Sequence, residues 1–187
     1  MTEVLDFSGF VRAHTTALLR SAFLLTGDRG TAEELVQDTL VRLYPRWSQV
    51  EAADVPIAYV RRSLTNNFLN GRRRKSSGEL LFADIPERGY DPDLPGRLGD
   101  RELVRELLNG LPPKQRAVLV LRFFHDLSDE QIAADLSCRP GTVRSIVSRA
   151  LSGLRELTEQ RAQAAARLRP EPPPHPGGAS ATNGNLR

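Results

Sequence analysis

The sequence predicts an all-α protein made of two small helical domains joined by a flexible linker. Leucine, alanine, arginine and glutamate are abundant, only 6% of the residues are aromatic, and few segments alternate with the period of two that a strand requires. The 187 residues suffice for one ordinary domain or two small ones. Residues 76–99 contain three prolines and show no sustained hydrophobic period, which predicts the linker.

Three amphipathic helices are predicted in the first domain, residues 1–75. Apolar residues recur at three- and four-residue steps from about Leu5 to Leu25, which indicates the first helix. The second opens at Thr31, a candidate N-cap that forms a capping box with Glu34, and Pro45 should kink or stop it. The third begins near Pro56, an acceptable residue for a first helical turn.

Four helices are predicted in the second domain, residues 100–160. Prolines 112 and 113 break the chain between the first two, and Ser128 with Gln131 forms a capping box at the start of the third. The tail, residues 161–187, is rich in proline and glycine, and we expect it to be disordered. The four helices are predicted at Asp100–Leu111, Lys114–Phe124, from Ser128 to a turn at 137–139, and from Pro140 to about residue 158.

The positive charge of the chain is concentrated in two stretches. The formal net charge is only +3, yet residues 61–75 carry six positive charges and residues 139–155 carry four arginines, both without an acidic residue. Eight acidic residues lie between them, in 76–106. Two basic faces are therefore separated by an acidic, flexible spacer.

The last predicted helix has an apolar side and a basic side. At about 100° per residue, Val143, Val147, Ala150, Leu154 and Leu157 fall on one narrow stripe. With the short helix and turn before it, this pattern is typical of a helix-turn-helix, whose second helix enters the DNA major groove. A solvated surface would explain an isolated basic helix, but the paired short helix and the acid-free face favour DNA binding. The basic side carries Arg144, Ser145, Ser148, Arg149, Ser152 and Arg155.

Several classes of function are disfavoured by the composition. The one cysteine cannot form an internal disulfide, and the three histidines are far apart in sequence, so we expect no metal site. No run of eighteen apolar residues and no signal-peptide pattern occur, which predicts a cytoplasmic protein without membrane contact. No glycine-rich phosphate loop or nucleophile elbow occurs, so we expect neither enzyme activity nor a cofactor.

Three stretches occur in the order and at the spacing of a known family. They are AEELVQDTLVRLYPRW at 32–47, AYVRRSLTNNFLNGRRRK at 58–75, and LPPKQRAVLVLRFFHDLSDEQIAADLSCRPGTVRSIVSRALSGLRE at 111–156. On these residues the chain resembles the extracytoplasmic-function (ECF) sigma factors of the sigma-70 family, the promoter-recognition subunits of bacterial RNA polymerase, and within them an actinobacterial SigE-like type. The likeness covers almost the whole chain up to about residue 158.

The resemblance implies a role for each stretch. It makes residues 1–75 a region 2 bundle that binds core polymerase and the promoter −10 element, and residues 100–160 a region 4 helix-turn-helix that binds the −35 element. The polymerase contacts would involve its clamp and flap regions. The clamp would be bound by Glu34, Gln37, Asp38 and Arg42. The −10 element would be bound and melted by Arg61, Arg62, Asn66, Asn67, Asn70, Arg72, Arg73 and Arg74, and the −35 element bound by Arg139, Thr142, Arg144, Ser145, Ser148 and Arg149.

The residue types suit these roles. Arginines supply phosphate contacts that hold DNA without reading it, whereas asparagines can read a base edge. By analogy with the family, a base flipped from the −10 element is captured near Asn66 and Asn67. Among the departures from the family pattern, Ser137 replaces the usual glycine of the turn, and Ile146 stands on the recognition helix where relatives often carry a polar or basic side chain. The −35 sequence therefore cannot be transferred from relatives.

Two other functions compete with a sigma factor. A stand-alone helix-turn-helix regulator would use the second domain alone, and the clamp-like helix at 32–47 argues against it. A nucleic-acid-processing enzyme would use the basic stretch 61–75 and would have to modify DNA by itself. The sequence also leaves open whether an anti-sigma factor is a further partner.

Overall fold

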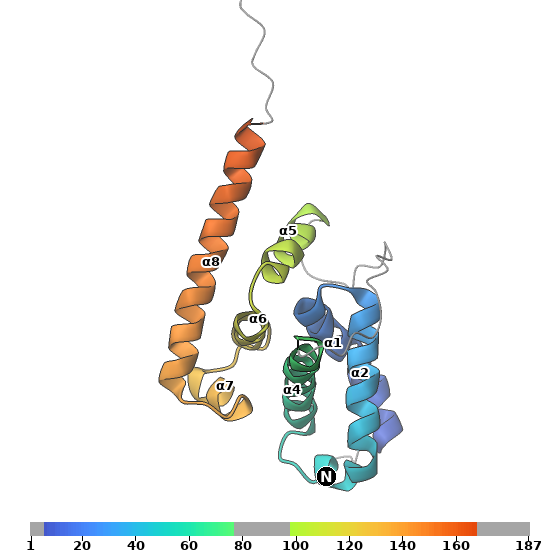
Figure 1. The fold of residues 1–187 in the computed structure, drawn as a ribbon. Coiled ribbons are helices and arrows are strands. Elements are labelled where there is room, and N and C mark those ends of the chain that lie inside the picture. The colour runs from blue at the N-terminus through green and yellow to red at the C-terminus, as the bar shows by residue number, and fades with distance from the viewer. Residues whose placement is uncertain (1–5, 77–97, 168–187) are drawn as a thin grey trace, which may run out of the picture.

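The computed structural model describes residues 6–76 and 98–167, and all elements in these ranges are helical (Figure 1). The predicted all-α class is confirmed. Most of the predicted linker, and the tail from residue 168, lie outside the described residues. The first half contains α1 (Phe7–Thr26), α2 (Arg29–Leu43), a 3₁₀ turn (Tyr44–Arg46), α3 (Trp47–Glu51) and α4 (Pro56–Ser76). The second half contains α5 (Leu98–Asn109), α6 (Pro113–Leu119), a π-helical turn (Val120–Phe124), α7 (Asp129–Asp135) and α8 (Pro140–Arg167).

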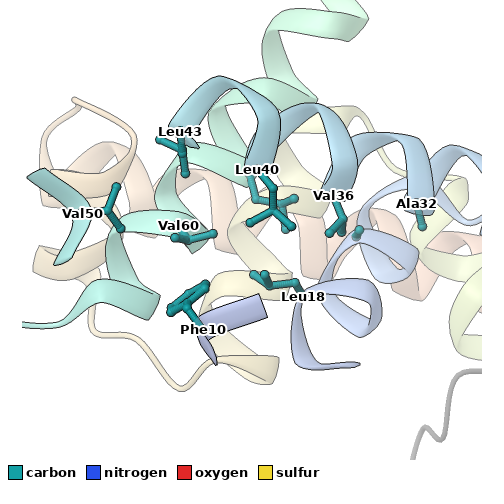
Figure 2. Close-up of a cluster of buried hydrophobic side chains, with 10 residues drawn as sticks. Phe10, Leu18, Ala32, Val36, Leu40, Leu43, Val50 and Val60 are labelled. Carbon is teal, nitrogen blue, oxygen red and sulfur yellow. The ribbon is translucent and has the colours of Figure 1, made fainter. Parts of the chain in front are cut away.

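Helices α1, α2 and α4 pack around one hydrophobic core in the first half (Figure 2). Phe10 and Leu18 project from α1 toward Leu40 of α2 and Val60 of α4. Each of these side chains is at most 9% exposed, and burial of one such side chain contributes about 1.5–3 kcal/mol. The periodic apolar residues therefore place the opposite face of α2 at the surface, whereas α4 also contacts the second half of the chain.

The junction between α1 and α2 differs from the prediction. Gly27 ends α1 in a left-handed conformation with φ 75°, and its amide donates to the carbonyl of Phe23. Asp28, not Thr31, is the N-cap of α2, because its carboxylate accepts from both the amide and the hydroxyl of Thr31 at 2.8 Å. The backbone hydrogen bond from Thr31 is the main reason that the pKa of Asp28 is lowered. The predicted capping box of Thr31 with Glu34 is therefore wrong, and α2 starts three residues earlier.

The second half contains the predicted helix-turn-helix. The Ser128–Gln131 capping box is confirmed, since the Gln131 side chain accepts from the Ser128 amide at 2.9 Å and the Ser128 hydroxyl accepts from the Gln131 amide at 3.3 Å. Helix α8 extends to Arg167, so its predicted end near residue 158 and the predicted start of disorder at 161 are too early. The alanine-rich stretch after residue 160 favours helix, and Arg161 forms an ion pair with Glu106 of α5. The hydrophobic core of the helix-turn-helix is formed by Val118, Leu121, Ile132, Ala133, Val143 and Ile146.

The two halves are in contact. Helices α5 and α6 lie between α8 and the α1–α4 side of the molecule (Figure 1). Leu24, Leu25 and Phe68 of the first half form one buried cluster with Ala117 and Val120 of the second. Hydrophobic periodicity does not reveal this contact, because a side chain buried between two halves has the same pattern as one buried within either.

Candidate nucleic-acid interface

Helix α8 presents the predicted basic face to solvent. Its apolar side is fixed by Val143 and Ala150, which are fully buried. On the opposite side, the Arg144 side chain is 67% exposed and lies 3.3 Å from Asp129, while the Arg149 guanidinium donates to the carbonyl of Ser145. All six residues predicted to bind the −35 element are exposed: Arg139, Thr142, Arg144, Ser145, Ser148 and Arg149.

Ser137 and Ile146, two departures from the family pattern, lie in the turn before α8 and on α8 itself. Ser137 has φ 50°, in the left-handed region that favours glycine, so serine occupies a strained position here. Ile146 is only 5% exposed and packs in the helix-turn-helix core with Val118 and Ile132. The side chain of Ile146 therefore points into the core and does not belong to the exposed side of α8.

Helix α4 does not present all its predicted −10 residues on one open face. Arg62 and Asn70 are exposed. Asn67 donates to the Thr39 hydroxyl on α2 at 3.2 Å. Arg61 and Asn66 point to α7 of the other half, as described below. Helix α4 extends through the basic stretch, but the side chains of Arg72, Arg73 and Arg74 are outside the described set.

Asp135, the last residue of α7, meets Arg61 and Asn66. A carboxylate oxygen of Asp135 lies 3.7 Å from the Arg61 guanidinium, and the Asp135 carbonyl accepts from the Asn66 amide at 3.5 Å. Both charged side chains are 16% exposed. Burial raises the pKa of Asp135, and Arg61 and Arg62 oppose this shift by attraction.

His125 forms a second polar contact between the halves. Its Nε2 lies 2.8 Å from the hydroxyl of Ser21, which is 2% exposed on α1. Burial, assisted by repulsion from Arg61, lowers the pKa of His125 to about 4. The imidazole is therefore neutral at neutral pH.

The predicted clamp-binding face of α2 is open and contains apolar residues that the sequence analysis missed. Its four predicted members, Glu34, Gln37, Asp38 and Arg42, are exposed. Val41 is 71% exposed and Tyr44, in the following 3₁₀ turn, is 62% exposed. Neither residue was given a role from the sequence, although their spacing of seven and ten residues from Glu34 could have placed them on this face. Exposed apolar side chains beside polar ones are typical of protein-binding surfaces.

A second exposed apolar site lies at the π-helical turn after α6. Phe123 is 65% exposed and Phe124 is 36% exposed. Both residues were predicted to lie at the end of a helix, and no functional role was predicted for them.

Within 6–76 and 98–167, no helix is long and apolar enough to span a bilayer. The same residues contain no cluster of three or more histidine, cysteine or acidic side chains placed to hold a metal ion.

Two family models match the chain in the order of its two halves. Sigma-70 region 2 matches residues 10–78, which include α1 to α4, and Sigma-70, region 4 matches residues 101–154, which include the helix-turn-helix. The RNA polymerase sigma-E factor of Streptomyces coelicolor is 40% identical over 156 residues, which are 83% of this chain and 88% of the relative. The ECF RNA polymerase sigma factor SigE of Mycolicibacterium smegmatis is 32% identical over 78% of this chain and 59% of the relative.

A solved structure has the same arrangement of helices. The sigma factor RpoE from Bartonella quintana, solved in complex with the anti-sigma factor NepR, superposes with a TM-score of 0.66 at 29% identity and covers 83% of this chain and 98% of its own. The chain therefore belongs to the sigma-70 family as an actinobacterial, SigE-like ECF sigma factor, the kind of protein that gives RNA polymerase promoter recognition at the start of transcription.

Proposed function

We propose that the basic face of α8 binds the promoter −35 element in the major groove. The observation that carries this proposal is the exposed, acid-free row from Arg139 to Arg149, held outward by the buried Val143 and Ala150. Arginines on such a helix pair with guanine edges or phosphates, and serine and threonine hydroxyls reach either. Arg144 and Arg149 would contribute most, because they combine charge with length.

The −10 element would be bound by α4. Arg61, Arg62, Arg72, Arg73 and Arg74 would contact phosphates, and Asn66, Asn67 and Asn70 would contact bases. Extrusion of a base costs a few kcal/mol of stacking, which these contacts have to offset. This supports a role of α4 in strand opening.

The exposed face of α2 would dock on the polymerase clamp. Val41 and Tyr44 supply an apolar centre, and Glu34, Gln37, Asp38 and Arg42 surround it with polar groups. Phe123 offers an apolar contact for the flap region from the second half. Polymerase would thereby fix the two DNA-binding surfaces relative to each other, so that the second DNA contact becomes effectively intramolecular.

The remaining functional assignments follow from this role. The chain would act in the cytoplasm, where polymerase and DNA are found, without catalysis and without a cofactor of its own. The complex of the Bartonella quintana relative with NepR supports an anti-sigma factor as a further partner of this chain.

Reconstitution with core polymerase tests the proposal. The purified chain should form a stable complex with core polymerase, and this complex should select promoters from random DNA and initiate transcripts at them. A stand-alone regulator would bind its DNA site tightly without polymerase and form no such complex. Tight binding to a DNA site without polymerase, or the lack of a complex with core polymerase, would contradict the proposal. DNA cleavage by the chain alone would contradict it as well.

A further inference from the structure

Asp129, the first residue of α7, lies between two arginines of the helix-turn-helix. One of its carboxylate oxygens forms an ion pair with Arg122 of the π-helical turn. The other oxygen lies 3.3 Å from Nε of Arg144, near the start of α8. A single side chain therefore connects the turn after α6 with the proposed DNA-binding face of α8.

The Asp129 carboxylate is held in place more firmly than the arginine that it faces. The Asp129 side chain is 14% exposed, whereas that of Arg144 is 67% exposed. Helix α7 is anchored by the fully buried Ile132 and begins with the capping box at Ser128. Asp129 thus gives Arg144 a fixed partner, while much of the Arg144 side chain stays in solvent.

The atom through which Arg144 meets Asp129 suits base recognition. Arginine binds O6 and N7 of a guanine with two nitrogens in a fixed fork. A guanidinium held at Nε can present its two terminal nitrogens outward for this contact. An arginine with a fixed orientation also loses less conformational freedom when it binds than one that is free to rotate.

We propose that Asp129 is a positioning residue for −35 recognition, which holds Arg144 in the orientation that reads a base pair. The proposal rests on the −35 role of α8 given above. Both carboxylate oxygens of Asp129 face arginines, so Asp129 would act through Arg144 and would not contact a base itself. Sequence discrimination at one base pair would then depend on a residue outside the recognition helix.

A purely structural role of Asp129 predicts a different result. The carboxylate would then only stabilise the N-terminal end of α7 and its contact with Arg122. Its loss would weaken binding to every −35 sequence by the same factor. The ratio of the affinities for two sequences separates these roles, because a smaller folded fraction lowers both affinities alike.

Holoenzyme reconstituted with the full chain measures this ratio. A promoter is selected from random DNA, each −35 base pair is replaced in turn, and the affinities for the original and the replaced sequence are compared. Arg144→Ala identifies the position that Arg144 reads, because discrimination falls there. Asp129→Asn should lower discrimination at that same position by about three- to tenfold and leave the other positions unchanged. Adding Asp129→Asn to Arg144→Ala should lower it no further.

Glu130→Gln is the matched control. It removes the same charge from the neighbouring, exposed position in the first turn of α7. The pKa of Glu130 is lowered, mainly by a hydrogen bond from its own backbone amide and to a smaller extent by attraction from Arg144 and Arg122. Among residues 6–76 and 98–167, however, Glu130 forms no ion pair with either arginine. Glu130→Gln should therefore keep the discrimination of the unchanged chain.

Three results would overturn the positioning role while the −35 role of α8 stands. They are unchanged discrimination in Asp129→Asn at the position that Arg144→Ala identifies, an equal loss at all −35 positions, and an equal loss in Glu130→Gln. If Arg144→Ala changes discrimination at no position, the assignment of Arg144 to the −35 element fails, and the positioning role of Asp129 fails with it. Circular dichroism and thermal melting establish how far each variant is folded.

Discussion

The guanidinium of Arg116 on α6 donates to the carbonyl of Leu25 at the end of α1, 2.8 Å away in the other half of the chain. It also donates to the side chain and carbonyl of Asn109 and to the carbonyl of Leu111. Helix α1 has no basic residue in its last turn, so Arg116 supplies the positive charge that its C-terminal end favours. The buried Arg116 thus connects the end of α1 in the first half to the segment between α5 and α6 in the second half.

Arg116→Met should lower the free energy of unfolding by roughly 3–5 kcal/mol, because it leaves several buried carbonyl groups without a donor. Urea titration followed by circular dichroism measures the change. Lys114→Met, at an exposed position on the same helix, should change stability by less than about 0.5 kcal/mol. Equal urea midpoints for the two variants would contradict the role of this network.

The stability of the chain should fall as the pH is lowered from about 6.5 to about 4. The pKa of His125 is about 4 in the folded chain, below its ordinary 6.5, so the unfolded chain takes up the proton first as the pH falls. Full protonation would cost roughly 2 kcal/mol, discounted for partial exposure to solvent. His125→Gln, which keeps a polar partner for Ser21, should flatten the dependence of the urea midpoint on pH. If His125→Gln leaves the pH dependence of the urea midpoint unchanged, groups other than His125 cause the loss of stability.

Val41→Asp should weaken binding to core polymerase by roughly tenfold or more, because it places a charge at the apolar centre of the α2 face. Val55→Asp is the control, since Val55 is also exposed, at 54%, but lies outside that face. The affinity of both variants for core polymerase is measured by competition against a labelled sigma factor. The assignment fails if the two variants compete equally well.

Arg149→Ala should weaken promoter binding by holoenzyme about 5- to 100-fold without unfolding the chain, because one DNA contact of 1–3 kcal/mol is lost. Arg12→Ala removes the same charge from an exposed position on α1 and should have little effect. Filter binding at physiological salt compares them. An unchanged promoter affinity of the Arg149→Ala holoenzyme would contradict the prediction that Arg149 contacts DNA.

Asn66→Ala should impair strand opening more than formation of the closed complex, because an asparagine contact to an extruded base exists only after melting. Transcription from a duplex promoter should fall, and transcription from a template with a pre-melted −10 region should recover. An equal loss on both templates would contradict a role in opening.

The sequence predicted the helices and the exposed side of α8 because both follow from the 3.6-residue period. Local competition between caps was harder to predict: Asp28 and Thr31 are both good N-caps, and only the geometry of the Gly27 turn selects Asp28. Ile146 was noted from the sequence only as a departure from the family pattern, and the structure places it in the core of the helix-turn-helix.

Contacts between the halves could not be predicted from the sequence. Arg61 and Asn66 belong to a basic, polar stretch, and nothing in their spacing indicates Asp135, which lies far along the chain. Phe68 is buried in a cluster that includes Val120 of the other half. Such contacts depend on how two folded units meet, which a helical period does not encode.

The open face of α2 beside the covered face of α4 has a consequence for the sequence of assembly. Chromosomal DNA offers about 10⁶–10⁹ competing non-specific sites, and a free basic chain would be sequestered on them. If the two faces have the roles proposed above, a chain whose α2 face is exposed and whose α4 residues Arg61 and Asn66 are covered would bind polymerase before it binds DNA. Promoter search would then be carried out by the assembled holoenzyme.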